Sequence, residues 1–197
     1  MKIEENSIEN VYNFQYLGSQ FQSDGDDTAD VKYRMNIAQS VFSSLHHIWN
    51  DHRLPTTMKL RLYQSAVCSS FTHACEAWDI TDRIRKKING FNSRCLSTIT
   101  NKDLRETAVN PDFDLVLSIR QRRLRYLGHI LRMAPDRLVK RTFLAYVGGT
   151  ESDPPEGSLL MDCDQLTLEE LTSKAMNKKG WTKFVNGVKP LNVTSML

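Results

Sequence analysis

Residues 115–141, LVLSIRQRRLRYLGHILRMAPDRLVKR, constrain the fold more than any other stretch, because one face of them must be buried. Apolar residues recur there at helical spacing and fill a broad face of a helix drawn at 100° per residue. That face comprises Leu115, Val116, Leu117, Ile119, Leu124, Leu127, Ile130 and Leu131. The stretch therefore predicts a helix that packs against other helices and is closed by Pro135.

The opposite face of this helix is basic, since the stretch holds eight Arg and Lys residues against one acid. A straight stripe about three turns long is formed by Arg122, Arg125, His129 and Arg132. Arg120 and Arg123 fall nearer the apolar face, so each is expected to extend to solvent, pair with an acid or meet a ligand phosphate. A solvated surface, a nucleic acid, a membrane or a partner helix all fit such a stripe.

Charge is distributed unevenly along the 197 residues, although the net charge is only +3. Residues 1–30 hold seven acids and one base, and residues 151–171 hold seven acids and no base. Between them, residues 31–150 hold twenty bases and nine acids. The acidic ends thus conceal a strongly basic middle, which is what a surface that binds polyanions needs.

The four cysteines show no CxxC pair and no histidine at zinc-finger spacing, which favours reduced, buried thiols and no metal site. No apolar run of eighteen residues and no signal peptide is present. The chain is therefore expected to be soluble and intracellular, with no membrane partner.

Three further helices precede the basic one. The first is predicted over residues 28–50, with Asp27 or Thr28 as its N-cap. The second begins at Pro55 and runs to about Trp78. The third covers Asp82 to about Thr100 and turns Ile84, Ile88, Phe91, Cys95 and Ile99 inward. Asn110-Pro111 breaks the chain before the basic helix, and the short connections imply a helical bundle.

The ends of the chain have different patterns. Residues 1–22 contain short β-prone runs that predict a small hairpin, in which Gly18 indicates a bulge or a close backbone approach. The acidic cluster Asp24-Gly25-Asp26-Asp27 lacks the glycine and glutamate positions of a calcium loop and is read as a turn into the first helix. One or two short helices, anchored by Trp181 and Phe184, are predicted between 167 and 188.

No catalytic constellation is found in the sequence. There is no GxSxG motif, no glycine loop for phosphate, no HExxH and no informative Cys/His pair. Two-metal phosphoryl transfer needs carboxylates from separate rigid elements, and a single Asp-Gly-Asp-Asp turn supplies them poorly.

Three segments, taken in sequence order, resemble motifs of one protein family. FQYLGSQFQSDGDDTADVKYRMNIA, from Phe14, resembles the passage from palm to thumb in non-LTR retrotransposon (LINE-type) reverse transcriptases, usually F-x-YLGS-x-(I/F)-x-SDG. LRLYQSAVCSSFTHACEAW resembles the thumb of these enzymes, although His73-Ala74 replaces their usual Tyr-Gly. RQRRLRYLGHILRM, from Arg120, is similar to their post-thumb R-x-RRLR-(W/Y)-(L/F)-GH-(I/V)-LR, and Trp181 resembles their closing W-x-x-x-V element.

The resemblance spans about residues 8–188. It implies that parts of the enzyme that hold the template and primer are present and that its catalytic motif is not. The family copies RNA into DNA with a palm Tyr-x-Asp-Asp motif and two metals, and this sequence has neither that motif nor an endonuclease signature. Tyr16, Leu17 and Gly18 match the hairpin that supports the primer terminus. The helices after them match the thumb that holds the template–primer duplex.

The sequence thus predicts a mainly α fold: a thumb-like helical bundle with a short N-terminal β-hairpin and a small C-terminal helical appendage. The expected divisions are a residual palm and primer-grip-like hairpin (1–24), a thumb and post-thumb bundle (25–147), a linker (148–165) and a C-terminal helical segment (166–197).

The function expected from the resemblance is that of a truncated, polymerase-inactive fragment that binds the backbone of RNA, DNA or an RNA–DNA hybrid without sequence specificity. Its binding residues would be Arg122, Arg125, His129 and Arg132, supported by Arg120 and Arg123. No cofactor is expected, because magnesium would belong to the absent palm. A separate chain that carries the palm and acts in trans is a second candidate partner.

Two alternatives remain. The first is a helical interaction domain whose basic face docks an acidic partner or the acidic ends of its own chain. The second is a decayed reading frame without a stable product, since a surface built to face a palm would invite aggregation. The sequence is compatible with location in the nucleus or in the cytoplasm, because only the family's integration step points to the nucleus.

Overall fold

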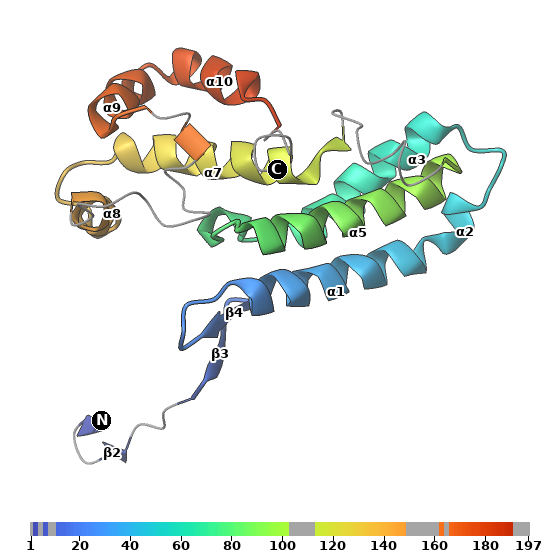
Figure 1. Cartoon of the computed structure of the whole chain (residues 1–197), viewed down its shortest axis with the longest axis horizontal. Helices are drawn as coiled ribbons and strands as arrows, with labels where there is room; N and C mark the ends of the chain where they lie inside the picture. Colours follow the sequence, from blue (N-terminus) through green and yellow to red (C-terminus); the bar gives the residue numbers. More distant parts are fainter. Residues whose placement is uncertain are drawn as a thin grey trace.

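The computed structural model describes residues 2–3, 6–7, 11–102, 113–148, 162–163 and 166–190, and this part of the chain is mainly helical with a short N-terminal hairpin. The predicted fold class is therefore confirmed. In Figure 1 the long helices lie roughly side by side, and the hairpin projects from the start of the first helix.

The hairpin consists of β3 (Asn13–Tyr16) and β4 (Ser19–Gln22), which pair antiparallel with Phe14 opposite Phe21. Leu17 and Gly18 form the two-residue connection, and both have positive φ, at 49° and 83°. Such a turn matches the twist of the flanking strands. The predicted bulge at Gly18 was wrong, because the glycine provides the turn itself. Two shorter strands, β1 (Lys2–Ile3) and β2 (Asn6–Ser7), pair with each other upstream.

The hairpin is fixed to the bundle through buried polar side chains of the first helix, α1 (Thr28–Ser44). Asp30 accepts hydrogen bonds from the Gln20 amide at 2.8 Å and from the Trp78 indole at 2.7 Å. Arg34 donates to the Gly18 carbonyl at 2.6 Å. A two-stranded ribbon is marginal alone, and these bonds attach it to a rigid helix.

The first predicted helix is interrupted. α1 ends at Ser44, and a short α2 (His46–Trp49) follows after Leu45. Asp27 occupies the N-cap position as expected, but its carboxylate accepts from the Asp79 amide at 2.7 Å and makes no cap bond. The acidic cluster does form a turn into α1, since the Asp26 carboxylate accepts from the Thr28 amide.

The second predicted helix is shorter and less regular than its sequence pattern indicates. α3 (Thr56–Leu62) passes into a π-helical segment, η1 (Tyr63–Cys68), and then into α4 (Ser69–Phe71). A 3₁₀ turn, η2 (Cys75–Ala77), follows, and Ala74 before it has a left-handed φ of 59°. The helix therefore ends near Phe71 and not at Trp78.

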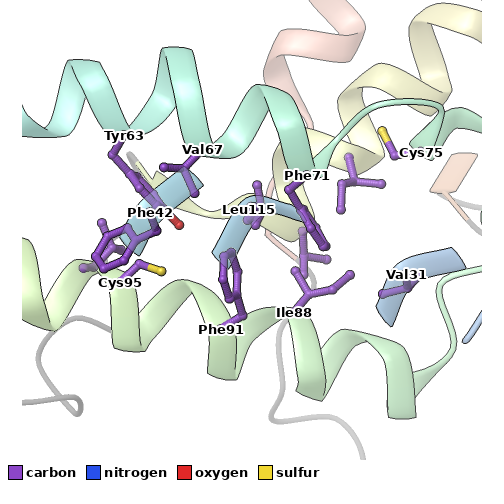
Figure 2. Close-up of a cluster of buried hydrophobic side chains, with 14 of the residues drawn as sticks. Val31, Phe42, Tyr63, Val67, Phe71, Cys75, Ile88, Phe91, Cys95 and Leu115 are labelled. Carbon is purple, nitrogen blue, oxygen red and sulfur yellow. The ribbon is translucent and has the colours of Figure 1, made fainter. Parts of the chain in front are cut away.

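The third predicted helix is found over its predicted length as α5 (Asp82–Thr100), capped by the Thr81 hydroxyl. Its five predicted inward residues are all buried. Figure 2 shows Ile88, Phe91 and Cys95 of this helix facing Phe42 of α1 and Tyr63, Val67 and Phe71 of η1 and α4. Leu115 of the basic helix reaches into the same cluster.

The basic helix is α7 (Leu115–Leu131), and its predicted apolar face is buried except for the half-buried Leu117. It ends four residues before Pro135, and a helix not foreseen as a separate element, α8 (Leu138–Gly148), follows. The predicted break at Asn110-Pro111 lies outside the described residues.

The C-terminal segment forms two short helices as predicted, α9 (Leu168–Met176) and α10 (Lys178–Gly187). Both pack along α7 (Figure 1), where Leu124, Leu127 and Leu131 meet Trp181 in a second core cluster. Within the described ranges, no helix is long and apolar enough to cross a membrane.

Candidate functional site

The exposed side of α7 forms one wall of a groove of about 910 Å³. The other wall is the irregular stretch from η1 through α4 to η2. Asp114 fixes the start of α7, since its carboxylate accepts from the Leu117 amide at 2.9 Å. The α7 residues that line the groove are Leu115, Ser118, Gln121, Arg122, Arg125, Tyr126 and His129. Three of the four stripe residues therefore share one concave surface.

Arg122 is held at the groove by the opposite wall. Its Nε donates to Glu76 Oε1 and its Nη1 donates to Thr72 Oγ1, both at 3.0 Å. The side chain nevertheless remains 42% exposed. Arg122 is thus an oriented cation that a ligand can still reach, although Glu76 neutralises part of its charge.

Arg125 and His129 are the more accessible cationic positions. Arg125 is exposed, and its Nη2 donates to Asn186 Oδ1 on α10 at 3.3 Å, a long bond between exposed groups. His129 is also exposed and lines the groove one turn farther along α7. Tyr126, 40% exposed, lies between them in sequence and lines the same groove.

Arg132 is directed elsewhere. Its Nη1 donates to the Ala175 carbonyl at 2.9 Å, in the last turn of α9. The bond satisfies a carbonyl that has no partner within its own helix, and Arg132 is not among the groove residues. The straight four-residue stripe is consequently divided between the groove and the contact with α9.

Arg120 and Arg123 lie inside the protein, only 5% and 1% exposed. Arg123 Nη1 lies 3.0 Å from Asp162 Oδ2, and Arg120 Nη2 donates to the Asp162 carbonyl at 2.8 Å. Arg120 also donates to the Lys189 carbonyl at 3.0 Å. Of the three outcomes expected for these arginines, pairing with an acid is the one found. Because both side chains are buried, their assignment as phosphate contacts was wrong.

Asp162 was itself missed by the sequence reasoning, which placed it in a linker. It is buried beside Cys163, and its carboxylate comes from the acidic segment 151–171. The presence of two arginines at apolar positions of α7 indicated that an acid was required, but the sequence has many acids and does not say which one folds back.

The primer-grip-like residues do not join the groove. Tyr16, Leu17 and Gly18 end β3 and form the hairpin turn, where Leu17 is 80% exposed. None of them lines the groove, and in Figure 1 the hairpin lies at the start of α1, away from α7.

None of the four cysteines forms a disulfide bond, and three of the four are buried. Burial raises the pKa of the Cys68, Cys75 and Cys95 thiols to about 12, so they stay protonated at neutral pH. No group of three His, Cys, Asp or Glu side chains suited to a metal ion occurs among the residues that the structure describes. The groove thus offers cations, hydroxyls, amides, one aromatic ring and the carboxylate of Glu76, which is paired with Arg122.

Comparisons of the chain with known protein families, with curated proteins and with solved structures find no significant match.

Proposed function

We propose that this chain is the thumb and post-thumb part of a non-LTR retrotransposon reverse transcriptase, and that it binds nucleic-acid backbone without sequence specificity. The ordered motifs around Tyr16, Trp78 and Arg122 support the family assignment. The helical bundle that follows a short hairpin is compatible with it.

The observation that carries the binding proposal is the groove that Arg122, Arg125 and His129 line together. Phosphate contacts position a nucleic acid without reading its sequence. Net charge of +11 over residues 31–150 adds a field that attracts a polyanion. Because Arg120, Arg123 and Arg132 have structural roles, two of the five arginines expected as contacts, Arg122 and Arg125, remain.

The test is a fluorescence-anisotropy titration of a labelled RNA–DNA hybrid over a salt series. Two phosphate contacts give a log–log salt slope of roughly −2, and removal of one reduces its magnitude by about 1. Arg125→Ala is therefore expected to weaken binding and flatten the slope.

Arg94→Ala is the matched control, because Arg94 is an exposed arginine on α5 that does not line the groove. Equal binding by the two variants and the unmodified protein would contradict the proposed surface. Absence of binding at low salt would contradict the proposed function.

The chain is proposed to be inactive as a polymerase by itself, because its sequence contains no Tyr-x-Asp-Asp motif. Primer extension with Mg²⁺ on a homopolymer template is expected to incorporate no nucleotide. Measurable incorporation would overturn this part of the proposal.

A second candidate function is docking of an acidic protein partner on the basic face. The pairing of Arg122 with Glu76 favours it, because a cation of the basic face already contacts a carboxylate of this chain. Saturable binding to one protein that competitor DNA does not displace would favour this alternative over nucleic-acid binding.

A further inference from the structure

We propose that the α7 groove takes a single strand of nucleic acid, with one base stacked on Tyr126 and neighbouring phosphates held by Arg122 and Arg125. The inference rests on the proposed function and specifies which form of nucleic acid enters the groove.

The size of the groove is the first argument. Its volume of about 910 Å³ falls within the range of roughly 300–1,000 Å³ typical of pockets for small molecules. Readout of base pairs in a duplex uses a convex element, because a helix enters a major groove about 12 Å wide. A hollow of this volume between two helical walls has room for a few nucleotides of one strand, whereas a duplex would contact only the cations at its rim.

The position of Tyr126 is the second argument. On α7 it lies four residues after Arg122 and three before His129, so the three side chains are neighbours on one face. The ring is 40% exposed at the groove instead of buried in either core cluster. Aromatic rings beside cations are the usual platform for unpaired bases, whose faces are not available within a duplex.

The neutral lining is the third argument. Between the cations and the apolar residues, the groove presents two amides and three hydroxyls, from Gln64, Ser69, Thr72, Ser118 and Gln121. The two amides can donate to and accept from base edges, and the three hydroxyls, which donate to backbone carbonyls, can still accept. A strand whose bases turn inward would meet these groups with its base edges.

The length of the site follows from helix geometry. Arg122 and His129 are seven residues apart, which corresponds to about 10 Å along α7 at 1.5 Å per residue. Two to three nucleotides fit this length at the rise of about 3.4 Å per nucleotide within one strand of a duplex. The groove is therefore expected to hold a short internal stretch of a longer strand.

The experiment compares three labelled 12-nucleotide probes with the full chain: a homopyrimidine RNA, the corresponding DNA, and the RNA–DNA hybrid duplex. Anisotropy titrations are made with the unmodified protein, Tyr126→Leu, Tyr126→Phe and the control Tyr146→Leu. Tyr146 is an exposed tyrosine on α8 that does not line the groove. Circular dichroism verifies that each variant is folded.

The expected result is that both single strands bind more tightly than the hybrid. Tyr126→Leu is expected to weaken single-strand binding about 5- to 150-fold, the usual effect of losing one stacked base, and to leave hybrid binding unchanged. Tyr126→Phe keeps the ring and should retain the affinity, as should Tyr146→Leu.

The outcomes separate the two proposals. Equal affinity for all probes with no effect of Tyr126→Leu, while Arg125→Ala still weakens binding, would overturn the single-strand inference and leave the proposed function standing. Failure of every probe to bind would overturn both. Loss of hybrid and single-strand binding to the same extent in Tyr126→Leu would also contradict the inference.

Discussion

Asp162 is the residue on which the attachment of the C-terminal segment to α7 depends most. Two guanidinium groups that are almost fully buried contact it. Removing one partner of a buried ion pair leaves an uncompensated charge in a medium of low polarity, which costs more than the pair itself contributes.

Asp162→Asn is therefore expected to lower the free energy of unfolding by about 3–5 kcal/mol, measured by urea denaturation. Asp51→Asn is the control, since Asp51 pairs on the surface with Arg53, whose side chain is 90% exposed. The control should unfold like the unmodified protein. Similar stability of the two variants would show that the buried pair has no such role.

Gly128 is a second position that decides the packing, because its lack of a side chain leaves room for the indole of Trp181. A Cβ added there would lie 2.2 Å from Nε1 of Trp181, which donates to the Leu124 carbonyl at 3.0 Å. Glycine in a helix interior otherwise costs up to about 1 kcal/mol relative to alanine, so its presence in α7 has a packing reason. The small residue lets the indole rest on the helix backbone.

Gly128→Ala is expected to destabilise the protein by about 1–3 kcal/mol through overpacking and to change the Trp181 fluorescence. Gly90→Ala in α5 is the matched control, because its Cβ would meet only Arg94 at an ordinary 3.5 Å. That variant should be neutral or slightly stabilised. A stabilised Gly128→Ala protein would contradict the observed contact.

At the scale of elements, a hydrogen bond joins the start of α1 to the residues after η2. Several carboxylates lie close together at this junction. Asp27 accepts from the Asp79 amide. Burial raises the pKa of the Asp27 carboxyl to about 6, and the nearby Asp79 and Asp30 add to the shift. Burial likewise raises the pKa of Asp79. This junction therefore favours the protonated form of Asp27.

The sign of the pH effect follows. Between an ordinary pKa of 3.8 and about 6, the native protein holds a proton on Asp27 that the unfolded chain has lost. This group thus stabilises the fold most below pH 4, and its contribution falls as the pH rises through 6. Asp27→Asn should remove that fall, so the Tm difference between variant and unmodified protein should grow from pH 4 to 7. Parallel Tm curves would contradict it.

Elements with a regular apolar period were predictable from the sequence, and those with irregular backbone were not. α5 and α7 repeat apolar residues at helical spacing, and the apolar faces predicted for them are buried in the structure apart from the half-buried Leu117. The stretch after Leu62 mixes apolar residues with small polar ones in a pattern that a regular helix also allows, so periodicity could not reveal its π segment or the left-handed turn at Ala74. That irregular stretch forms the second wall of the groove, which the sequence therefore did not indicate.

The candidate site was predictable only in part for a related reason. A helical wheel places Arg122, Arg125 and His129 on one face but does not show what the neighbouring elements do to them. Thr72 and Glu76 on the opposite wall orient Arg122, and α9 takes up Arg132. These contacts join residues 43 to 50 positions apart and depend on the tertiary fold.

At the scale of the whole molecule, α7 connects two core clusters. Its first turns complete the cluster built by α1, η1, α4 and α5, and its later turns carry α9 and α10 (Figures 1 and 2). The groove lies along the exposed side of this shared helix. A ligand bound there would contact an element that both clusters hold rigid, which suits a binding site.

The most direct test of this account is an NMR titration of the ¹⁵N-labelled protein with the 12-nucleotide single strand, followed by amide chemical shifts. If the strand binds in the α7 groove, the shift changes will concentrate on Ser118–His129 of α7 and on Ser69–Ala77 of the facing wall. The exposed side of α5 around Lys86 and Arg94 should remain unchanged. Shift changes centred on α5, α8 or the hairpin, or no changes at millimolar strand, would contradict the claim that the α7 groove is the nucleic-acid site.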